Sequence, residues 1–313
     1  MHTALLAVAL LVGCLLAVQA SANLQLNKAV GTPYGASTLQ LGLATGLLAV
    51  LAAAAGALGA LGRLPDVDGW MLLGGLASPL YITSGILLFP RLGALAAVGL
   101  FVTGQMFASL ALDLFGLIGL ERRAPSAGVV LGALAVLAGI VVIIRAQRAA
   151  GPTGAGTGLS RAGRIGWPAL GIVAGAALPV QGAVNARLRA RLEEPLAVAV
   201  VSFTVATFAI AVVLLVLYAT RRTPKPQVAP LKKMPWWGWL GGACAAAYVT
   251  GTFLLIPEIG AAVTVALTVT GQQLTSALID QRGLFRLPRR ALSGPRATGL
   301  GLLLAGSLAI QLA

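Results

Sequence analysis

Long apolar segments alternate with short polar ones along almost the whole chain. Each apolar segment has roughly 20 residues, the length that an α-helix needs to cross the hydrocarbon core of a bilayer. The pattern predicts ten transmembrane helices, which span Thr3–Ala22, Ser37–Leu61, Gly69–Phe89, Leu92–Leu117, Ser126–Ile144, Trp167–Arg187, Leu196–Ala219, Trp236–Ile256, Ile259–Ile279 and Thr298–Leu312. We therefore expect an all-α integral membrane protein.

The first apolar segment resembles a secretory signal peptide, but we expect it to be a helix of the mature protein. Met1–Ala22 ends in small residues, and Leu11–Cys14 has the residue order of a lipoprotein cleavage box. A signal peptide begins with basic residues, whereas this segment has no Lys or Arg. The pattern of the segment also recurs in the middle of the chain.

The two halves of the chain repeat one another. At an offset of 167 residues the matches include Trp70 with Trp237, Tyr81 with Tyr248, Pro90 with Pro257, Gln105 with Gln272, Ser109 with Ser276, and Asp113 with Asp280. At an offset of 162 residues the first helix matches the sixth, pairing Gly13, Gln19, Asn23 and Pro33 with Gly175, Gln181, Asn185 and Pro195. Residue types as varied as these do not match in one register by chance. The sequence predicts a first five-helix repeat at 1–148, a Gly-rich linker at 149–164 and a second repeat at 165–313.

Five is an odd number of helices, so two copies in one chain must insert into the membrane in opposite orientations. We therefore expect inverted repeats related by a pseudo-two-fold axis in the membrane plane. Many secondary transporters are built in this way and bind substrate near the midplane between the repeats. Dense basic clusters follow the fifth, seventh and ninth helices, and the positive-inside rule then places both termini outside the cytoplasm.

Composition agrees with a membrane protein and argues against nucleic-acid binding. Charged residues make up 10% of the chain, whereas a soluble domain averages about 25%. The chain has 22 Lys and Arg against 8 Asp and Glu. The basic residues lie between the apolar segments rather than in a patch with aromatic residues, so they indicate orientation in the membrane. The expected surroundings are membrane lipids, and no nucleic-acid partner is expected.

Two pairs of amides are the first candidates for substrate binding. Gln19 and Asn23 are four residues apart and share one helix face, and Gln181 and Asn185 repeat the arrangement. Polar side chains that face lipid are unfavourable, so these faces should look inward. They either form hydrogen bonds between helices or line a substrate path, and the sequence leaves both alternatives open.

Further polar side chains lie inside the fourth and ninth helices and near the middle of the third and eighth. Gln105 and Gln272 each stand four residues before a serine and are candidates for the lining of a cavity. Tyr81 and Tyr248 need a partner for the hydroxyl if they are buried. They either contact substrate or belong to the core.

Asp113 and Asp280 are the carboxylates that lie at matching positions within or beside apolar segments. A desolvated aspartate has a raised pKa and could carry a coupling proton. The alternative is a helix-end aspartate paired with a nearby loop arginine, such as Arg282 or Arg122. We favour this second interpretation.

The sequence lacks the residue patterns of the common membrane enzymes. It has one histidine, no H-E-x-x-H motif and no cysteine spacing typical of a metal site or a disulfide framework. It also lacks a Walker motif. We expect no metal, no cofactor and no enzymatic activity.

Several motifs resemble the YdcZ-type family of the drug/metabolite transporter superfamily. The segment from Gly175 to Leu188, with Gln181 and Asn185, is followed by Pro195 and Ser202-Phe203, and Gly13 to Leu26 is a weaker copy. The segments from Gly104 to Gly116 and from Gly271 to Gly283 are similar to a "GQ…D-x-x-G" motif of that family. The first copy departs from the pattern, since Leu41 stands where the second half has Phe203.

The resemblance implies an inner-membrane exporter made of five-helix domains, in a fused form that covers nearly the whole chain. We expect a plasma-membrane, multi-pass secondary transporter that exports small organic molecules by alternating access. The rivals are a lipid-carrier flippase and a non-transporting scaffold or accessory subunit. The sequence leaves open whether the protein forms a homodimer. The superfamily often keeps its termini in the cytoplasm, which disagrees with the orientation expected from the basic clusters.

Overall fold

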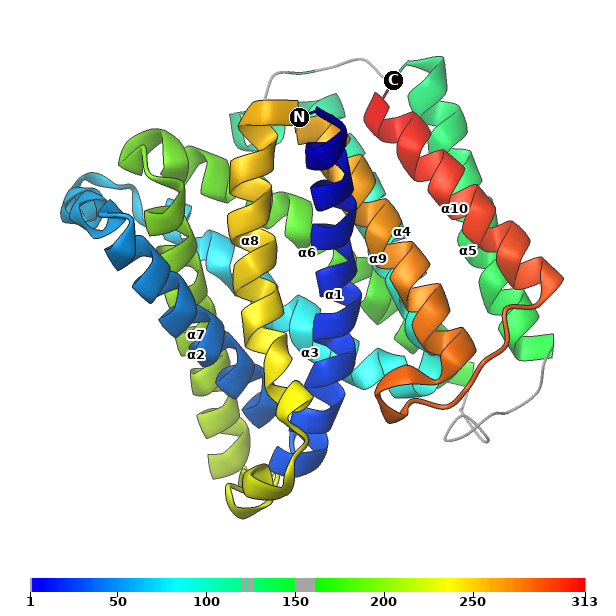
Figure 1. Ribbon diagram of the computed structural model, residues 1–313, viewed down its shortest axis with the longest axis horizontal. Coiled ribbons are helices and arrows are strands. Elements are labelled where there is room, and N and C mark those ends of the chain that lie inside the picture. The colour runs from blue at the N-terminus through cyan, green and yellow to red at the C-terminus, as the bar shows by residue number, and fades with distance from the viewer. Residues whose placement is uncertain (1, 120–121, 123–125, 150–160, 260, 313) are drawn as a thin grey trace. The chain divides into compact units, whose positions relative to one another are not determined.

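A computed structural model describes residues 2–119, 122, 126–149, 161–259 and 261–312. The described residues form ten α-helices: α1 (His2–Val30), α2 (Pro33–Ala54), α3 (Ala77–Leu92), α4 (Ala94–Phe115), α5 (Ala127–Ala149), α6 (Arg161–Leu192), α7 (Pro195–Ala219), α8 (Leu240–Ile259), α9 (Ala261–Arg282) and α10 (Gly294–Leu312) (Figure 1). Short 3₁₀ helices connect them: η1 (Ala57–Asp66), η2 (Gly69–Leu76), η3 (Leu117–Gly119), η4 (Ala229–Lys233), η5 (Trp236–Trp239) and η6 (Leu284–Arg286). The all-helical prediction is confirmed for this part of the chain.

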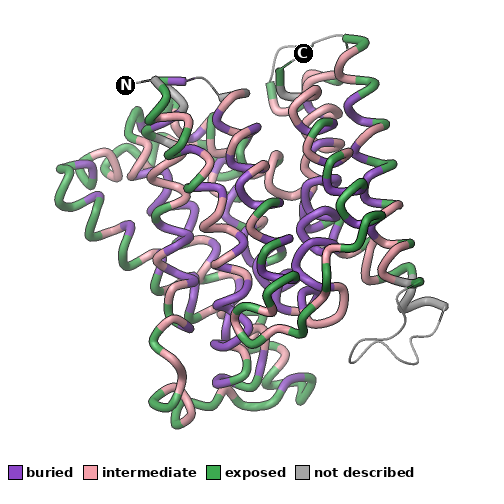
Figure 2. Tube along the Cα trace, turned by 45° about the vertical axis from the view of Figure 1, so that its right-hand side comes forward, coloured by how far each residue is buried: buried purple, intermediate pink, exposed green. Residues whose placement is uncertain are grey.

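Seven helical segments of the described chain are long and apolar enough to cross a membrane: Thr3–Val30, Pro33–Ala54, Gly69–Leu92, Ala94–Phe115, Ala127–Gln147, Ile165–Leu192 and Pro195–Ala219. Buried and exposed positions alternate around the helices (Figure 2). Many exposed side chains are large and apolar, among them Leu131, Phe208 and Leu254. So many exposed apolar groups would be unfavourable in water and are suited to contact with lipid chains.

Several predicted helix ends differ from the structure, among them the start of α3 and both ends of α6, and two cases have a clear physical cause. The first helix continues to Val30 rather than ending at Ala22, because the polar side chains in its last two turns are buried, as Asn23 and Gln25 show. It ends where Gly31 takes a positive φ of 81°, a conformation that glycine adopts without strain. The second helix ends at Ala54 rather than Leu61, because Gly56 has a φ of 71° and the chain continues as the 3₁₀ helix η1.

The chain divides into two compact units, and each draws on both halves of the sequence. Unit 1 comprises Met1–Ala17, Leu87–Ala176 and Gly251–Ala313. In this unit α5 and α10 lie side by side (Figure 1). Gly132 packs against the Gly306 carbonyl and Gly139 against the Gly299 carbonyl, and in each case a Cβ would come within 2.8 Å of the oxygen. The reversed order of these contacts makes the two helices antiparallel.

Unit 2 comprises Val18–Ile86 and Ala177–Thr250. In this unit α2 packs along α7 (Figure 1), and the hydroxyls of Thr45 and Thr207 lie 2.9 Å apart where the two helices meet. A buried apolar cluster joins η2 to the end of α6 and the start of α7. Its members are Met71, Leu188, Leu192, Ala197, Val198 and Val201.

Close helix contacts occur in pairs whose members stand at repeat-equivalent positions. In unit 1, Gly104 packs against the carbonyl of Ile172, and Gly271 packs against the carbonyl of Leu10. The two glycines are 167 residues apart in the sequence and their two partners are 162 residues apart, so each contact is the repeat equivalent of the other. The glycines of α1 and α6 behave in the same way, since Gly13 meets Thr268 and Gly175 meets Phe101. Each contact therefore joins one half of the sequence to the other.

Candidate functional site

Gln181 and Asn185 belong to a hydrogen-bonded amide cluster in unit 2. Gln181 on α6 exchanges hydrogen bonds with Ser78 on α3: Ser78 Oγ donates to Oε1 at 3.1 Å, and Nε2 donates to Oγ at 2.9 Å. The amides of Gln181 and Asn185 both donate to Ser202 Oγ on α7, at 3.3 and 3.2 Å. Gly74 packs against Asn185 Oδ1. The predicted pair thus lies on one helix face, and that face is covered by two other helices.

Gln19 and Asn23 belong to the repeat-equivalent cluster, also in unit 2. Asn23 Oδ1 packs against Gly241, the repeat mate of Gly74. Gln40 on α2 stands where the second half has Ser202, and its Nε2 donates to the Gly241 carbonyl at 3.3 Å. All three amides are buried, with at most 5% of each residue exposed. This cluster therefore joins α1 and α2 of the first half to α8 of the second.

The two clusters differ in how the glutamine oxygen is satisfied: Gln181 Oε1 accepts from Ser78, whereas the asparagine oxygens Asn185 Oδ1 and Asn23 Oδ1 both lack a partner among the described residues. Gln19 Oε1, Asn23 Oδ1 and Gln40 Oε1 have no hydrogen-bond partner among the described residues. For Gln19 the cause lies in the sequence, because Ala245 stands where the other half has Ser78, the donor to Gln181 Oε1. A buried acceptor without a partner costs about 1–3 kcal/mol. The Gln19 cluster therefore has more unused hydrogen-bonding capacity in the described chain than the Gln181 cluster, where the unpaired amide oxygen is Asn185 Oδ1.

The two predicted tyrosines also lie in unit 2. Tyr81 is buried, whereas Tyr248 is half-buried. Two residues beyond Tyr81, the Thr83 hydroxyl lies 2.9 Å from that of Ser37. The repeat mate of Thr83 is Thr250, whose hydroxyl has no partner in the described chain, because Ala199 stands where the first half has Ser37. The difference between the two clusters thus extends to a neighbouring hydroxyl pair.

Gln105 and Gln272 lie in unit 1, on α4 and α9. Gln105 is half-buried and its Nε2 has no partner among the described groups, whereas Gln272 is buried. Gln273, which the sequence analysis did not single out, is fully buried, and neither of its side-chain polar atoms has a partner in the described chain. Thr103 and Thr270 donate to carbonyls of their own helices.

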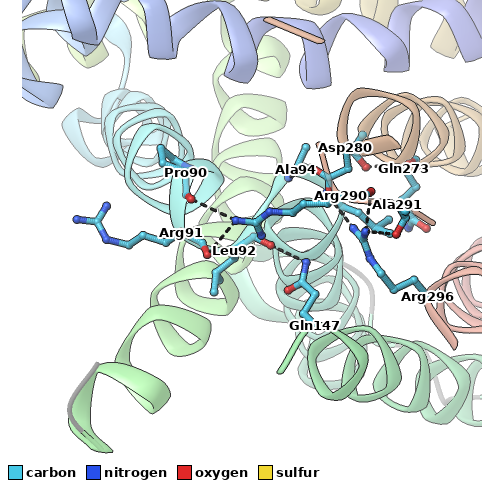
Figure 3. A network of polar contacts seen from close by, with 12 residues as sticks. Pro90, Arg91, Leu92, Ala94, Gln147, Gln273, Asp280, Arg290, Ala291 and Arg296 are labelled. Atoms are coloured by element: carbon cyan, nitrogen blue, oxygen red, sulfur yellow. Dashed lines mark hydrogen bonds and ion pairs between the residues drawn. The ribbon is translucent and has the colours of Figure 1, made fainter. Parts of the chain in front are cut away.

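Asp280 is the centre of a buried charge network in unit 1 (Figure 3). Its carboxylate accepts hydrogen bonds from the amides of Ala94 and Leu95, at 2.7 and 3.2 Å, and so caps the start of α4. Arg296 Nη2 donates to the same carboxylate at 2.7 Å, and the pair is almost fully buried. An aspartate at a helix N-terminus is favourable because it satisfies free N–H groups and faces the positive end of the helix dipole.

Arg290 holds the end of α3 at the same junction. Its Nη2 donates to the carbonyls of Pro90 and Arg91, both at 3.3 Å (Figure 3). Burial lowers the pKa of Arg290, and Asp280 opposes this shift. Gly93 separates α3 from α4 with a φ of 79°, and a Cβ there would lie 2.7 Å from Arg290 Nη1. A short, positively charged segment between α9 and α10 thus fixes the α3–α4 connection.

The helix-end interpretation of Asp280 gains support from this geometry, with a different arginine. The partner is Arg296, whereas Arg282 is exposed. Arg122 instead donates to the Leu114 carbonyl at 3.0 Å, as its repeat mate Arg289 does to Gln281. These arginines were the wrong choice because the chain reverses direction after the helix and brings a more distant residue back to the carboxylate.

Asp113 has different surroundings from Asp280. It is half-buried, and the position that matches Arg296 in the first half is Val129. The repeat equivalents of Gly93, Ala94 and Leu95 are residues 260–262, where the structure does not describe the side chains. Asp113 therefore lacks the basic residue that pairs with Asp280 in the second half.

The residues that sequence analysis missed share one property. Gln40, Gln273 and Arg296 each stand where the other half has a different residue: Ser202, Met106 and Val129. A search for matched positions passes over them. A search for polar residues that break the repeat would have found all three.

The described chain is thus a helical membrane protein whose buried polar clusters combine residues from both halves of its sequence. A family model described as "Putative inner membrane exporter, YdcZ" matches residues 4–142 and 166–309. The chain belongs to this family, in the fused form with two copies of the domain. It is therefore a multi-pass inner-membrane protein of a transporter family rather than an enzyme.

Comparison with solved structures supports the fold alone. One crystal structure covers 97% of this chain and 96% of its own, with a TM-score of 0.58 and 19% sequence identity. At this identity the likeness carries no information on substrate. A search of curated proteins found no significant match.

Proposed function

We propose that the protein is a secondary-active exporter of small organic molecules that works by alternating access. In this proposal all ten α-helices cross the membrane, as two inverted five-helix repeats. Substrate binds between the repeats at the amide clusters of Gln19 with Asn23 and Gln181 with Asn185. One repeat then rocks against the other around the bound molecule. Gln105, Gln272, Tyr81 and Tyr248 remain candidates for further contacts.

The observation that carries the proposal is the exchange of contacts between the halves. Asn185 meets Gly74 and Asn23 meets Gly241, so each amide packs on a glycine of the opposite half. A two-fold relation between the repeats produces this reciprocity. Two five-helix repeats in one chain can have this two-fold relation in a membrane when the second repeat is inverted. The polar clusters then occupy the interface that moves in transporters of this plan.

The state of the polar groups favours a transporter over a scaffold. A scaffold needs its buried polar pairs to satisfy one another, because an unused buried acceptor only lowers stability. In the described chain the oxygens of Gln19, Asn23 and Gln40 are buried without partners. An unused acceptor of this kind is suited to a ligand that supplies the missing donor. A flippase remains the second candidate among transporters.

We assign proton coupling to Asp113 rather than to Asp280. Asp280 accepts hydrogen bonds from two backbone amides and forms an ion pair with Arg296. Protonation would remove the charge that pairs with Arg296 and weaken the hydrogen bonds from the two amides, so this side chain is suited to a fixed structural role. Asp113 has no such arginine in the described chain and remains the candidate for coupling.

Solute counterflow in proteoliposomes tests the proposal. Vesicles are loaded with an unlabelled amino acid, nucleoside, sugar or cationic drug, and uptake of the labelled solute is measured. At least one solute should accumulate transiently in vesicles with the wild-type protein, and Asn185→Ala should slow this uptake. Uptake equal to that of empty vesicles for every solute, together with flipping of a labelled polyprenyl phosphate, would favour the flippase.

A further inference from the structure

We propose that the Gln19 cluster binds neutral solutes that carry several hydroxyl or N–H donors, and that Gln40 is one of its binding residues. The inference rests on the proposed function, since it assigns ligand chemistry to the same site. Its basis is the kind of atom left unpaired. In the described part of α1 and α2, the unpaired buried side-chain atoms are all amide oxygens: Gln19 Oε1, Asn23 Oδ1, Asn27 Oδ1 and Gln40 Oε1.

The orientation of the Gln40 amide follows from its backbone contact. A carbonyl oxygen only accepts hydrogen bonds, so the atom that faces the Gly241 carbonyl must be Nε2. The other atom, Oε1, is then the one without a partner. Asn23 Oδ1 packs against Gly241 as well. Two buried amide oxygens from different helices therefore lack a donor in the described chain near one glycine.

The oxygens on α1 extend along one face of the helix. Gln19, Asn23 and Asn27 follow one another at four-residue spacing, so they cover about 12 Å of helix length. A ligand with a single donor can use one of them. A ligand with several donors spaced along its length, such as a polyol, a nucleoside or a short peptide-like amide, can use the series.

Charge excludes a cation as the preferred ligand. The acidic residues of unit 2 in the described chain all lie in the segments that connect its helices, and all are exposed. They are Asp66, Asp68, Glu193 and Glu194. An ammonium group at the buried amides would lose its hydration without gaining a counter-charge. A neutral hydroxyl or amide N–H loses less hydration and gains the same hydrogen bonds.

The repeat shows how Gln181 in the second cluster gains a donor that Gln19 lacks. Ser78 serves Gln181 one turn away from the contact between Gly74 and Asn185. Asn23 and Gly241 form the matching contact, and α1 and α8 run in opposite directions (Figure 1). Gln19 and Ala245 each lie one helical turn from that contact, so they stand opposite one another. A serine at position 245 would supply the donor that Gln19 lacks.

Ala245→Ser is therefore the decisive variant, and Ala246→Ser is its control, because both alanines are buried neighbours on α8. Thermal unfolding of the purified protein is recorded with a nucleoside, a hexitol and a primary amide. Each is compared with a methylated analogue, its twin, in which methyl groups replace the donor hydrogens. At least one donor solute should raise the Tm of the wild type more than its twin does. Its apparent Kd should weaken about fivefold to tenfold in Ala245→Ser and stay unchanged in Ala246→Ser.

Equal shifts with a solute and its twin would overturn the inference, and so would equal binding by the two variants or no shift with any solute. Counterflow of the same solutes separates this failure from failure of the proposed function. Donor-specific binding without transport would keep the site and reject the exporter. Transport that ignores both the donors and Ala245→Ser would keep the exporter and reject the site.

Discussion

The hydroxyls of Thr45 and Thr207 lie 2.9 Å apart, and the two residues are 162 positions apart in the chain. That separation is the offset of the sequence repeat in this region, so each threonine meets its own repeat mate. Two equivalent residues can touch only at the axis that relates them. In the inverted-repeat arrangement proposed above, this contact lies on the pseudo-two-fold axis, between α2 and α7 of unit 2.

Each of these hydroxyls has one proton and two acceptors within reach. Thr45 lies 2.8 Å from the Leu41 carbonyl, and Thr207 lies 2.8 Å from the Phe203 carbonyl. When one threonine donates across the axis, it gives up the bond to its own helix. We expect the double-mutant cycle of Thr45→Val and Thr207→Val to give a coupling of about 0.6 kcal/mol, the average for such bonds in membranes. Strictly additive losses of stability would show that the hydroxyls do not interact.

Asp280 and Asp113 are repeat mates with different expected contributions to stability. Asp280→Asn leaves Arg296 buried without its counter-charge, so it should lower the free energy of unfolding by about 3–5 kcal/mol. Asp113→Asn is the matched control and should change it by about 1 kcal/mol or less. Thermal and denaturant unfolding in one detergent would measure both. Similar losses in the two variants would contradict the structural role given to Asp280.

Gln273 is the repeat mate of Met106, and both residues are buried. Neither polar atom of the Gln273 side chain has a partner in the described chain. Gln273→Met removes two unsatisfied groups and keeps a flexible side chain of similar length. The free energy of unfolding should therefore rise by about 1–3 kcal/mol.

The reverse change, Met106→Gln, introduces an amide into the equivalent apolar position and should lower stability. Unfolding of both variants is measured under the same conditions as the wild type. A loss of stability in Gln273→Met would mean that the Gln273 amide makes favourable interactions. The Gln273 side chain would then have a hydrogen-bond partner in the folded protein.

The sequence predicted the helices and the matched polar positions, because both follow from local pattern. Apolar length identified the helices, and the offsets of 167 and 162 residues led to Gln19, Asn23, Gln181 and Asn185. The end of α1 was missed because buried polar residues such as Gln25 extend the helix beyond its apolar part. Hydropathy cannot distinguish a buried amide from an exposed one.

Contacts that depend on chain reversal lay beyond the sequence analysis. The partner of Asp280 is Arg296, which follows it by 16 residues and returns to it through a loop. Gln40 was missed for a similar reason, since its backbone partner Gly241 is 201 residues away in the sequence. Neither pairing leaves a periodic trace in the sequence. Both could be found only once the helices were placed within their own unit.

Opposite orientation of the two repeats is the central claim, and labelling of two equivalent positions tests it most directly. Asp66 and Lys233 are exposed, stand 167 residues apart and precede equivalent helices. Single cysteines are placed at these positions after replacement of Cys14 and Cys244 and are labelled with a membrane-impermeant thiol reagent in right-side-out and inverted vesicles. The account predicts that Asp66→Cys and Lys233→Cys react from opposite sides of the membrane. Reaction of both from the same side would contradict inverted repeats and the transport mechanism built on them.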